Sequence, residues 1–387
     1  MTVTWVTLCP SKEGSVQYGT PLIDKSTNAS VTKFEDGGKR RKVIYVYRAF
    51  LTDLIPGQKY FVGDLGLENG QSVPSLIDDV MNEKIDFVIH NGWYSFLALA
   101  SLTVSLILGD IAYDMHSKNG KVGNEFMRKI EAIAANVAYM TTPGNHEETY
   151  NFSHYENRFT MIDWNTGKMN NHYYSFKAGP VLIICFSTEF YYSTYYNEYH
   201  IRTQYEWLKS TLQKANQPEN RLLQPWIITV GHQPMYCTMK NVALNHDCTN
   251  KRSKVRKGIG ESGEYGLEYL FYKHGVDLQM WAHEHSYERL WPVYDSIVLN
   301  GSILEPYTNP KAPVHLISGG AGNFKGFDEF SDVIENWSAL RVNDYGYTII
   351  EVINVTHTKL VQYSVVEKIE FDEFYLVKDV HGSYEKL

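Results

Sequence analysis

The stretch Trp226-Ile-Ile-Thr-Val-Gly-His232 is a short apolar run that ends at a glycine followed by a histidine. A short apolar run bounded by a turn signal is typical of a buried β-strand. Glycine allows the backbone to approach a site closely, and the next residue then presents its side chain at the carboxyl end of the strand. The same pattern recurs along the chain and decides the fold.

From about residue 61 onward, strand candidates alternate with segments of helical periodicity. This alternation predicts an α/β layered domain whose site lies at the carboxyl ends of strands. The candidate strands are 61–62, 87–90, 181–186, 226–230, 278–281 and 314–317. The candidate helices are 73–84, 123–135, 203–215 and 264–274.

Residues 1–60 are expected to form a separate all-β segment. Short strands at 3–8 and 42–51 lie among polar stretches, which favours a β-sandwich. Residues 54–60 resemble the turn and tyrosine of a fibronectin type III-like domain. Such a domain needs roughly 100 residues, yet the chain passes directly from Tyr60 into Phe61-Val-Gly-Asp64. We therefore predict a truncated fibronectin III-like domain over 1–60 and a catalytic domain over 61–387, with its C-terminal part at 310–387.

Residues 91–107, NGWYSFLALASLTVSLI, contain no charged residue and interrupt a strand-to-loop passage. The run is shorter than the roughly 20 residues of a membrane-spanning helix, so no stable span is expected; a buried helix or strand extension is the alternative. Without it, residues 86–90 would join Leu108-Gly-Asp-Ile-Ala-Tyr as a better strand and turn. We predict that 91–107 is foreign to the catalytic fold, and that only one of 87–90 and 104–108 is the strand leading into Asp110.

The composition is that of a soluble globular protein, with 387 residues, 43% apolar and 21% charged. A formal net charge of −8 and the lack of a long basic run argue against nucleic acid or an anionic membrane as the main partner. Of the four cysteines, Cys237 and Cys248 are a plausible pair. Five glycosylation sequons favour a secreted or lysosomal protein, although no signal peptide follows Met1, and we expect the true N-terminus to be missing. The sequons begin at Asn28, Asn151, Asn300, Asn336 and Asn354.

Five short polar motifs follow apolar strand candidates in order along the chain. They are Gly63-Asp64-Leu65-Gly66, Gly109-Asp110-Ile111-Ala112-Tyr113, Gly144-Asn145-His146-Glu147, Gly231-His232 and His283-Glu284-His285. Each is weak alone, because Gly-Asp ends many turns and most histidines are structural. Together they supply seven hard oxygen or imidazole donors, which predicts a metal site.

The joint pattern resembles the calcineurin-like metallophosphoesterases. Tyr113 and the run His283-Glu-His285-Ser-Tyr287-Glu-Arg289 narrow the resemblance to the purple acid phosphatases, specifically the animal form that resembles the large plant enzymes. It covers essentially the whole chain. It implies a β-sandwich flanked by helices in four αββα layers, and acid phosphatase activity on phosphate monoesters or phosphorylated substrates.

The resemblance also implies a dinuclear Fe(III)–M(II) centre in which a metal-bound hydroxide is the nucleophile. Fe(III) would be held by Asp64, Tyr113 and His285, and the divalent ion by Asn145, His232 and His283, with Asp110 between them. The chemistry agrees, since phenolate and carboxylate suit Fe(III) whereas imidazole and amide oxygen suit Zn(II), Fe(II) or Mn(II). Two ions can clamp a phosphate ester and activate water.

Two further histidines are predicted to act in catalysis. His146 follows Asn145 directly and is assigned by the resemblance to hydrogen-bond the phosphate, with a structural role as the alternative. His246 lies where related enzymes place histidines that assist the leaving group. Glu147, Glu148 and Glu284 are expected to tune or solvate the rim of the site.

Three other functions compete with this interpretation. The protein Ser/Thr phosphatases share part of the motif set, but they carry Asp-Arg-Gly where this chain has Tyr113. A phosphodiesterase remains an alternative, since the ligands do not select between esters. An inactive glycoprotein is the other, because of the shortened N-terminal domain and the 91–107 run.

Overall fold

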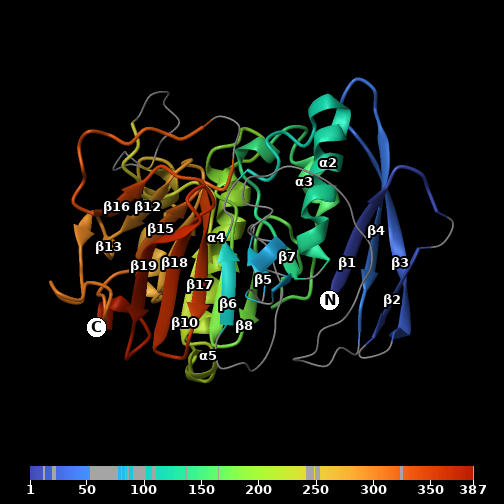
Figure 1. Cartoon of the computed structure of the whole chain (residues 1–387). Helices are drawn as coiled ribbons and strands as arrows, with labels where there is room; N and C mark the ends of the chain where they lie inside the picture. Colours follow the sequence, from blue (N-terminus) through green and yellow to red (C-terminus); the bar gives the residue numbers. More distant parts are fainter. Residues whose placement is uncertain are drawn as a thin grey trace.

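The computed structural model describes residues 1–11, 14–19, 23–52, 77–79, 81–82, 84, 87–89, 102–106, 110–135, 137–163, 165–240, 248, 253–322 and 326–386. Within these ranges the strands form sheets of seven, six, four and two strands. The two largest sheets stack face to face, and the four-stranded sheet stands at one end of the molecule (Figure 1).

The seven-stranded sheet has the order β16-β12-β15-β11-β10-β9-β8, and its central strands β9, β10, β11 and β15 are parallel. Parallel strands covered on both faces are apolar throughout, which is why they were predictable from sequence. The bounds are β8 Tyr174–Ala178, β9 Val181–Cys185, β10 Trp226–Val230, β11 Leu278–Trp281, β12 Tyr287–Leu290, β15 Val314–Ser318 and β16 Ser338–Val342. A short hairpin, β13 Val293–Tyr294 with β14 Ile297–Val298, follows β12.

The six-stranded sheet has the order β19-β18-β17-β6-β5-β7. Its strands are β5 Phe87–Ile89, β6 Leu102–Leu106, β7 Ala138–Met140, β17 Gly346–Val352, β18 His357–Ser364 and β19 Ile369–Val377. β6 lies between β5, to which it is parallel, and β17, to which it is antiparallel. Both segments are thus strands and neighbours in the sheet, and β6 is the one that ends shortly before Asp110. Whether 91–107 is foreign to the fold stays a prediction.

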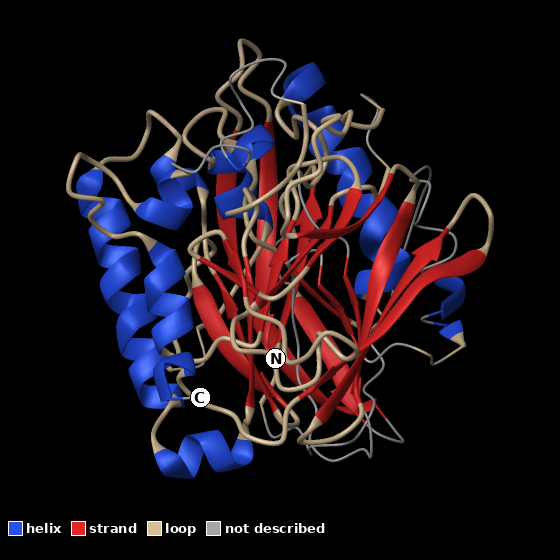
Figure 2. Cartoon of the chain, turned by 90° about the vertical axis from the view of Figure 1, so that its left-hand side faces the viewer, coloured by secondary structure: helices blue, strands red, loops and turns tan. Residues whose placement is uncertain are grey.

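The main core lies between the two large sheets. Alternate residues of β9 divide between two environments: Ile183 packs toward β17 and β18, whereas Leu182 and Ile184 face helices. Helices α4 Glu198–Ala215 and α7 Leu267–Lys273 contribute Leu208 and Phe271 to that second cluster. On the outer face of the other sheet, Ile133 of α2 Ser117–Ala134 packs with Tyr347 of β17. The order is helix, sheet, sheet, helix, and helices flank the stacked sheets in Figure 2.

The shorter elements complete these layers. They are α3 Ser153–Arg158, α5 Pro218–Leu223, α6 Lys254–Lys257 and the 3-10 turns Asn145–Glu147, Glu189–Tyr191 and Tyr384–Lys386. The predicted pair Cys237–Cys248 is confirmed as a disulfide with its Cα atoms 5.1 Å apart. No helix in the described part of the chain has the length and apolar character needed to cross a bilayer.

The N-terminal sheet is antiparallel, with the order β1-β4-β3-β2. β1 Thr2–Thr7 and β4 Val43–Phe50 were predicted, whereas β2 Ser15–Gly19 and β3 Ile23–Glu35 were not. β3 is rich in Ser, Thr, Asn and Lys, so it has no apolar run that would mark it as a strand. The likeness to a fibronectin III domain stays a prediction. Arg48 of β4 joins this sheet to the rest by donating to Thr160 Oγ1 at 2.8 Å and to the Asn157 carbonyl at 2.8 Å.

Candidate metal centre

Two predicted donors lie side by side because their strands do. β10 and β11 are parallel neighbours, so His232 and His283, which follow them, emerge at the same edge of the sheet. Their rings are 5.0 Å apart, and His232 Nε2 lies 3.2 Å from His283 Nδ1. Gly231 is required here, because a Cβ would lie 2.8 Å from the Phe186 ring and 2.9 Å from the Trp281 ring.

Asn145 and Asp110 complete this group from the other sheet. Asn145 Oδ1 lies 3.0 Å from His232 Nε2 and 3.1 Å from His283 Nδ1. Asp110 Oδ1 lies 3.4 Å from His232 Nε2. Gly144 makes the approach possible, since a side-chain carbon there would overlap Asp110 Oδ1. Four donor atoms from four segments thus gather around one point.

Tyr113, His285 and His146 form a second group on the other side of Asp110. Tyr113 Oη lies 2.9 Å from His285 Nε2, and the Tyr113 and His146 ring centroids are 4.9 Å apart. The His146 backbone N–H donates to Asp110 Oδ1 at 3.2 Å, while its Nε2 lies 3.7 Å from Asp110 Oδ2. Asp110 therefore contacts both groups, with Oδ1 near His232 and the His146 N–H, and Oδ2 near the His146 ring.

The backbone is strained at these positions. Tyr113 has φ 44°, Asp114 φ 76° and His283 φ 65°, all in the left-handed region that non-glycine residues rarely adopt. Such conformations cost of order 1–3 kcal/mol each and persist where the surroundings hold them, commonly at functional sites.

Glu147 holds two of the site's loops together. Its carboxylate accepts hydrogen bonds from the Ile111 N–H at 3.3 Å and the Gly144 N–H at 3.0 Å, and the side chain is buried. Of the two roles expected for Glu147 and Glu284, solvation of the rim is wrong because both are buried, and tuning of the site stays a prediction. Burial, followed by the charge of Asp110, raises the pKa of Glu147 well above its usual value.

Two carboxylates orient predicted site residues, although the sequence did not single out either of them. Asp114 Oδ1 lies 3.0 Å from His146 Nδ1. Asp328 Oδ2 accepts from the His285 backbone N–H at 2.7 Å. Asp114 follows Tyr113 directly and could have been considered. Asp328 lies 43 residues from its partner, so no local pattern marks it.

The protonation of His232 suits metal binding. Burial lowers its pKa to about 3, with further contributions from His146 and His285, so the imidazole is neutral and keeps a lone pair. For Tyr113, burial and then the charges of Asp110 and Glu147 raise the pKa, so the phenolate form needs a nearby cation.

The arrangement of donors fits a small cation. Asn145 Oδ1, His283 Nδ1 and Asp110 Oδ1 lie 3.0 to 3.4 Å from His232 Nε2. A tetrahedral ion with bonds of roughly 2.0–2.1 Å spaces its ligands about 3.3–3.4 Å apart. His232 Nδ1 is buried without a hydrogen-bond partner among the described residues. The residues around His232 Nε2 therefore fit a metal ion.

Not every predicted site residue can be placed. Asp64 and His246 lie outside the described residues. Cys237, Cys248 and Glu284 also lie close together, with Cys248 Sγ 3.1 Å from Glu284 Oε1. Both sulfur atoms are bonded to each other, so this group lacks the thiolates that a metal would need.

Comparison with known proteins gives a consistent result. Residues 59–287 match the calcineurin-like phosphoesterase family, and residues 312–369 match the iron/zinc purple acid phosphatase-like protein C family. The chain is 43% identical to acid phosphatase type 7 of Homo sapiens over 398 residues, which covers 94% of this chain and 84% of that protein. It is 42% identical to the Danio rerio protein of the same name over 422 residues, covering 99% and 89%.

Among solved structures, a purple acid phosphatase from yellow lupin seeds superposes with a TM-score of 0.70 at 18% identity. The match covers 98% of this chain and 72% of the lupin chain. At this identity the likeness concerns the fold alone.

Proposed function

The chain belongs to the calcineurin-like phosphoesterases and, within them, to the purple acid phosphatases, and from this premise we propose that it hydrolyses phosphate monoesters under acidic conditions at a dinuclear Fe(III)–M(II) centre. It is a phosphatase. The observation that carries the finer proposal is the convergence of Asp110, Tyr113, Asn145, His232, His283 and His285 from separate loops.

The residues divide into two sets that suit different ions. Asn145, His232 and His283 offer an amide oxygen and two imidazoles, a set for Zn(II), Fe(II) or Mn(II). Tyr113 and His285, with the predicted Asp64, offer the harder set for Fe(III). We place Asp110 between the two ions, since its Oδ1 lies near His232 and its Oδ2 near His146. When bound, the two ions would neutralise charge on the phosphate and lower the pKa of water.

His146 is placed to act on the substrate rather than on a metal. Asp114 holds its Nδ1 at 3.0 Å, which leaves Nε2 on the side of Asp110. Because the Asp114 carboxylate accepts the Nδ1 proton, Nε2 can donate to a phosphate oxygen and orient the ester only when the ring is in its doubly protonated imidazolium form. His246 is proposed to assist the leaving group, as the resemblance implies.

Secretion and glycosylation are also proposed. The sequons support them, and four of their asparagines, Asn28, Asn151, Asn336 and Asn354, are exposed, whereas the Asn300 side-chain oxygen is buried. Mass spectrometry of protein from a eukaryotic host should find glycan at exposed sequons and none at Asn300.

The shortened N-terminal domain remains part of the proposal. The alignment with the Danio rerio protein is 422 residues long, whereas this chain has 387, so that relative has residues inside the matched region that this chain lacks. We propose that some of these residues belong to domain 1–60.

The test is metal analysis of the purified protein together with turnover of p-nitrophenyl phosphate and bis(p-nitrophenyl) phosphate at pH 5. We expect two metals per chain, one of them iron, and faster hydrolysis of the monoester. Preference for the diester would support the phosphodiesterase alternative. A folded, metal-free and inactive protein would support the inactive glycoprotein.

A further inference from the structure

A cavity of about 110 Å³ lies far from the metal centre along the sheet. Its lining includes Lys177 of β8, Leu182 near the start of β9, and Lys214 at the end of α4. The candidate metal ligands follow the opposite, carboxyl ends of the parallel strands β10 and β11. The cavity is therefore separate from the catalytic site.

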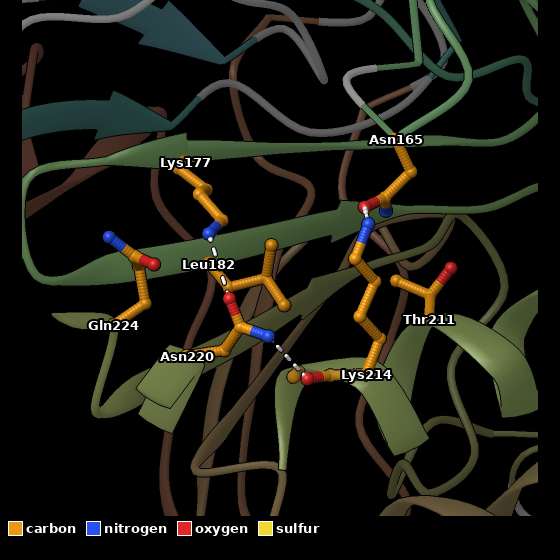
Figure 3. A pocket seen from close by; sticks show the side chains of 8 residues that line it. Asn165, Lys177, Leu182, Thr211, Lys214, Asn220 and Gln224 are labelled. Carbon is orange, nitrogen blue, oxygen red and sulfur yellow. Dashed lines mark hydrogen bonds between the residues drawn. The ribbon is translucent and has the colours of Figure 1, made fainter. Parts of the chain in front are cut away.

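The two lysines bring positive charge into this cavity, and Figure 3 shows them at its sides. Lys177 Nζ donates to Asn220 Oδ1 at 3.4 Å, and Lys214 Nζ donates to Asn165 Oδ1 at 3.0 Å. Both partners are neutral amides, so the bonds orient the ammonium groups without cancelling their charge. Each ammonium has three donors, which leaves capacity for a ligand.

No carboxylate among the described residues pairs with either lysine. Lys209, earlier on the same helix, does have such a partner in Glu206. Asp163, two residues before the lining residue Asn165, accepts hydrogen bonds from Thr166 and Ser175. The two ammonium groups without a carboxylate partner give this cavity a local positive charge, whereas the chain as a whole has a formal net charge of −8. Burial, and then the charge of Lys214, lower the pKa of Lys177, which is consistent with their proximity.

The size of the cavity and the residues that line it restrict which chemical groups can bind there. A water molecule needs roughly 10–15 Å³ of such space, so the cavity has room for a group with four oxygens. Thr211 also lines the cavity, and in Figure 3 its hydroxyl points away from the two lysines. Ammonium groups that are not paired with a carboxylate recognise phosphate oxygens.

We propose that the cavity lined by Lys177, Lys214 and Thr211 is a second, non-catalytic binding site for a phosphate group. The group could be orthophosphate, the product of the reaction, or the phosphate of a small ester. Lys177 and Lys214 each donate to its oxygens.

Equilibrium dialysis of the full-length, metal-loaded protein with radiolabelled orthophosphate tests this. We expect Lys177→Met/Lys214→Met to bind one phosphate fewer per chain than the unmodified protein. The matched control Lys209→Met removes a paired lysine from the same helix and should leave the count unchanged. The test compares the number of phosphates bound by the variant and by the unmodified protein, so phosphate bound at the metal centre cancels out. This proposal can therefore fail even if the proposed phosphatase function is correct, and the reverse also holds.

Two further measurements sharpen the result. Lys177→Gln and Lys214→Gln keep a hydrogen-bonding group but lose the charge, and each should weaken this site by at least about tenfold. Turnover of p-nitrophenyl phosphate should be unchanged in all of these variants. Repeating the dialysis with labelled glucose 6-phosphate under inhibition of turnover separates product from ester. An equal phosphate count in the folded double variant and the unmodified protein would overturn the proposal.

Discussion

His154 Nε2 lies 2.7 Å from Asp36 Oδ1, and this buried contact joins the N-terminal sheet to helix α3. On the other side of the ring, Arg158 Nε donates to His154 Nδ1 at 3.4 Å. The two bonds fix the tautomer, since Nδ1 accepts and Nε2 donates. Phe34 packs edge-on against the same ring. A buried polar contact, with Phe34 packed beside it, thus attaches the N-terminal sheet to helix α3.

Asp36→Ala should destabilise the folded protein by about 3 kcal/mol, because it leaves the buried His154 Nε2 without its acceptor and removes a charge that compensates the buried Arg158. The matched control is Glu35→Ala, one residue away, whose ion pair with Arg41 is exposed and should contribute less than about 1 kcal/mol. Thermal or urea unfolding measures both. Equal effects of the two substitutions would show that the buried contact does not stabilise the sheet.

The same contact should weaken in acid. Burial, opposed by Asp36 and reinforced by Arg158 and His116, lowers the pKa of His154 below 6.5 in the folded state. A histidine with a depressed pKa contributes stability above its unfolded pKa and loses that contribution as the pH falls through its folded pKa. Unfolding temperature should therefore drop between pH 7 and pH 5 more steeply than in His154→Gln. If the two slopes match, His154 does not titrate in this window.

Tyr113→Phe should abolish the visible charge-transfer band that tyrosinate ligation to Fe(III) would give. Absorption spectra of the two proteins, normalised to iron content, measure this. Tyr195→Phe, which alters an exposed tyrosine, should keep the band. A colourless but fully active protein with two zinc ions would contradict the iron assignment and leave the phosphatase assignment intact.

His146→Ala should lower kcat by about 100-fold with little change in metal content, since the proposal places it beside the ions. Asp114→Asn should have a smaller effect in the same direction, because it disturbs the group that holds His146 Nδ1. Steady-state kinetics and metal analysis on the same preparations separate the roles. Loss of metal in parallel with activity would instead make His146 a ligand.

Deletion of residues 91–107 should raise soluble yield, metal content and phosphatase activity, ideally with a complete N-terminal domain present. The experiment is demanding, because residues 102–106 pair with both β5 and β17 and the sheet must close again without them. If all three quantities fall, the segment belongs to the fold.

The sequence predicted the central parallel strands and most of the site for one physical reason. Buried strands are continuously apolar, and candidate donors follow two of them in Val230-Gly-His232 and Trp281-Ala-His283, so these segments can be recognised from the local sequence. Polar strands such as β3 lack a continuous apolar run and cannot be recognised in this way. Asp36 and Asp328 were missed because their roles depend on partners 118 and 43 residues away. The pairing of β5 with β6 likewise depends on the whole sheet.

The Cys237–Cys248 bond bears on how the protein can be produced. Cys248 Sγ touches Glu284, which stands between His283 and His285, so the covalent bond reaches the loop that presents two candidate ligands. Disulfides persist in oxidising compartments and rarely in the bacterial cytosol. Chain made in a reducing expression host would fold without this bond beneath the loop, so oxidative folding should precede any loading of the site with metal.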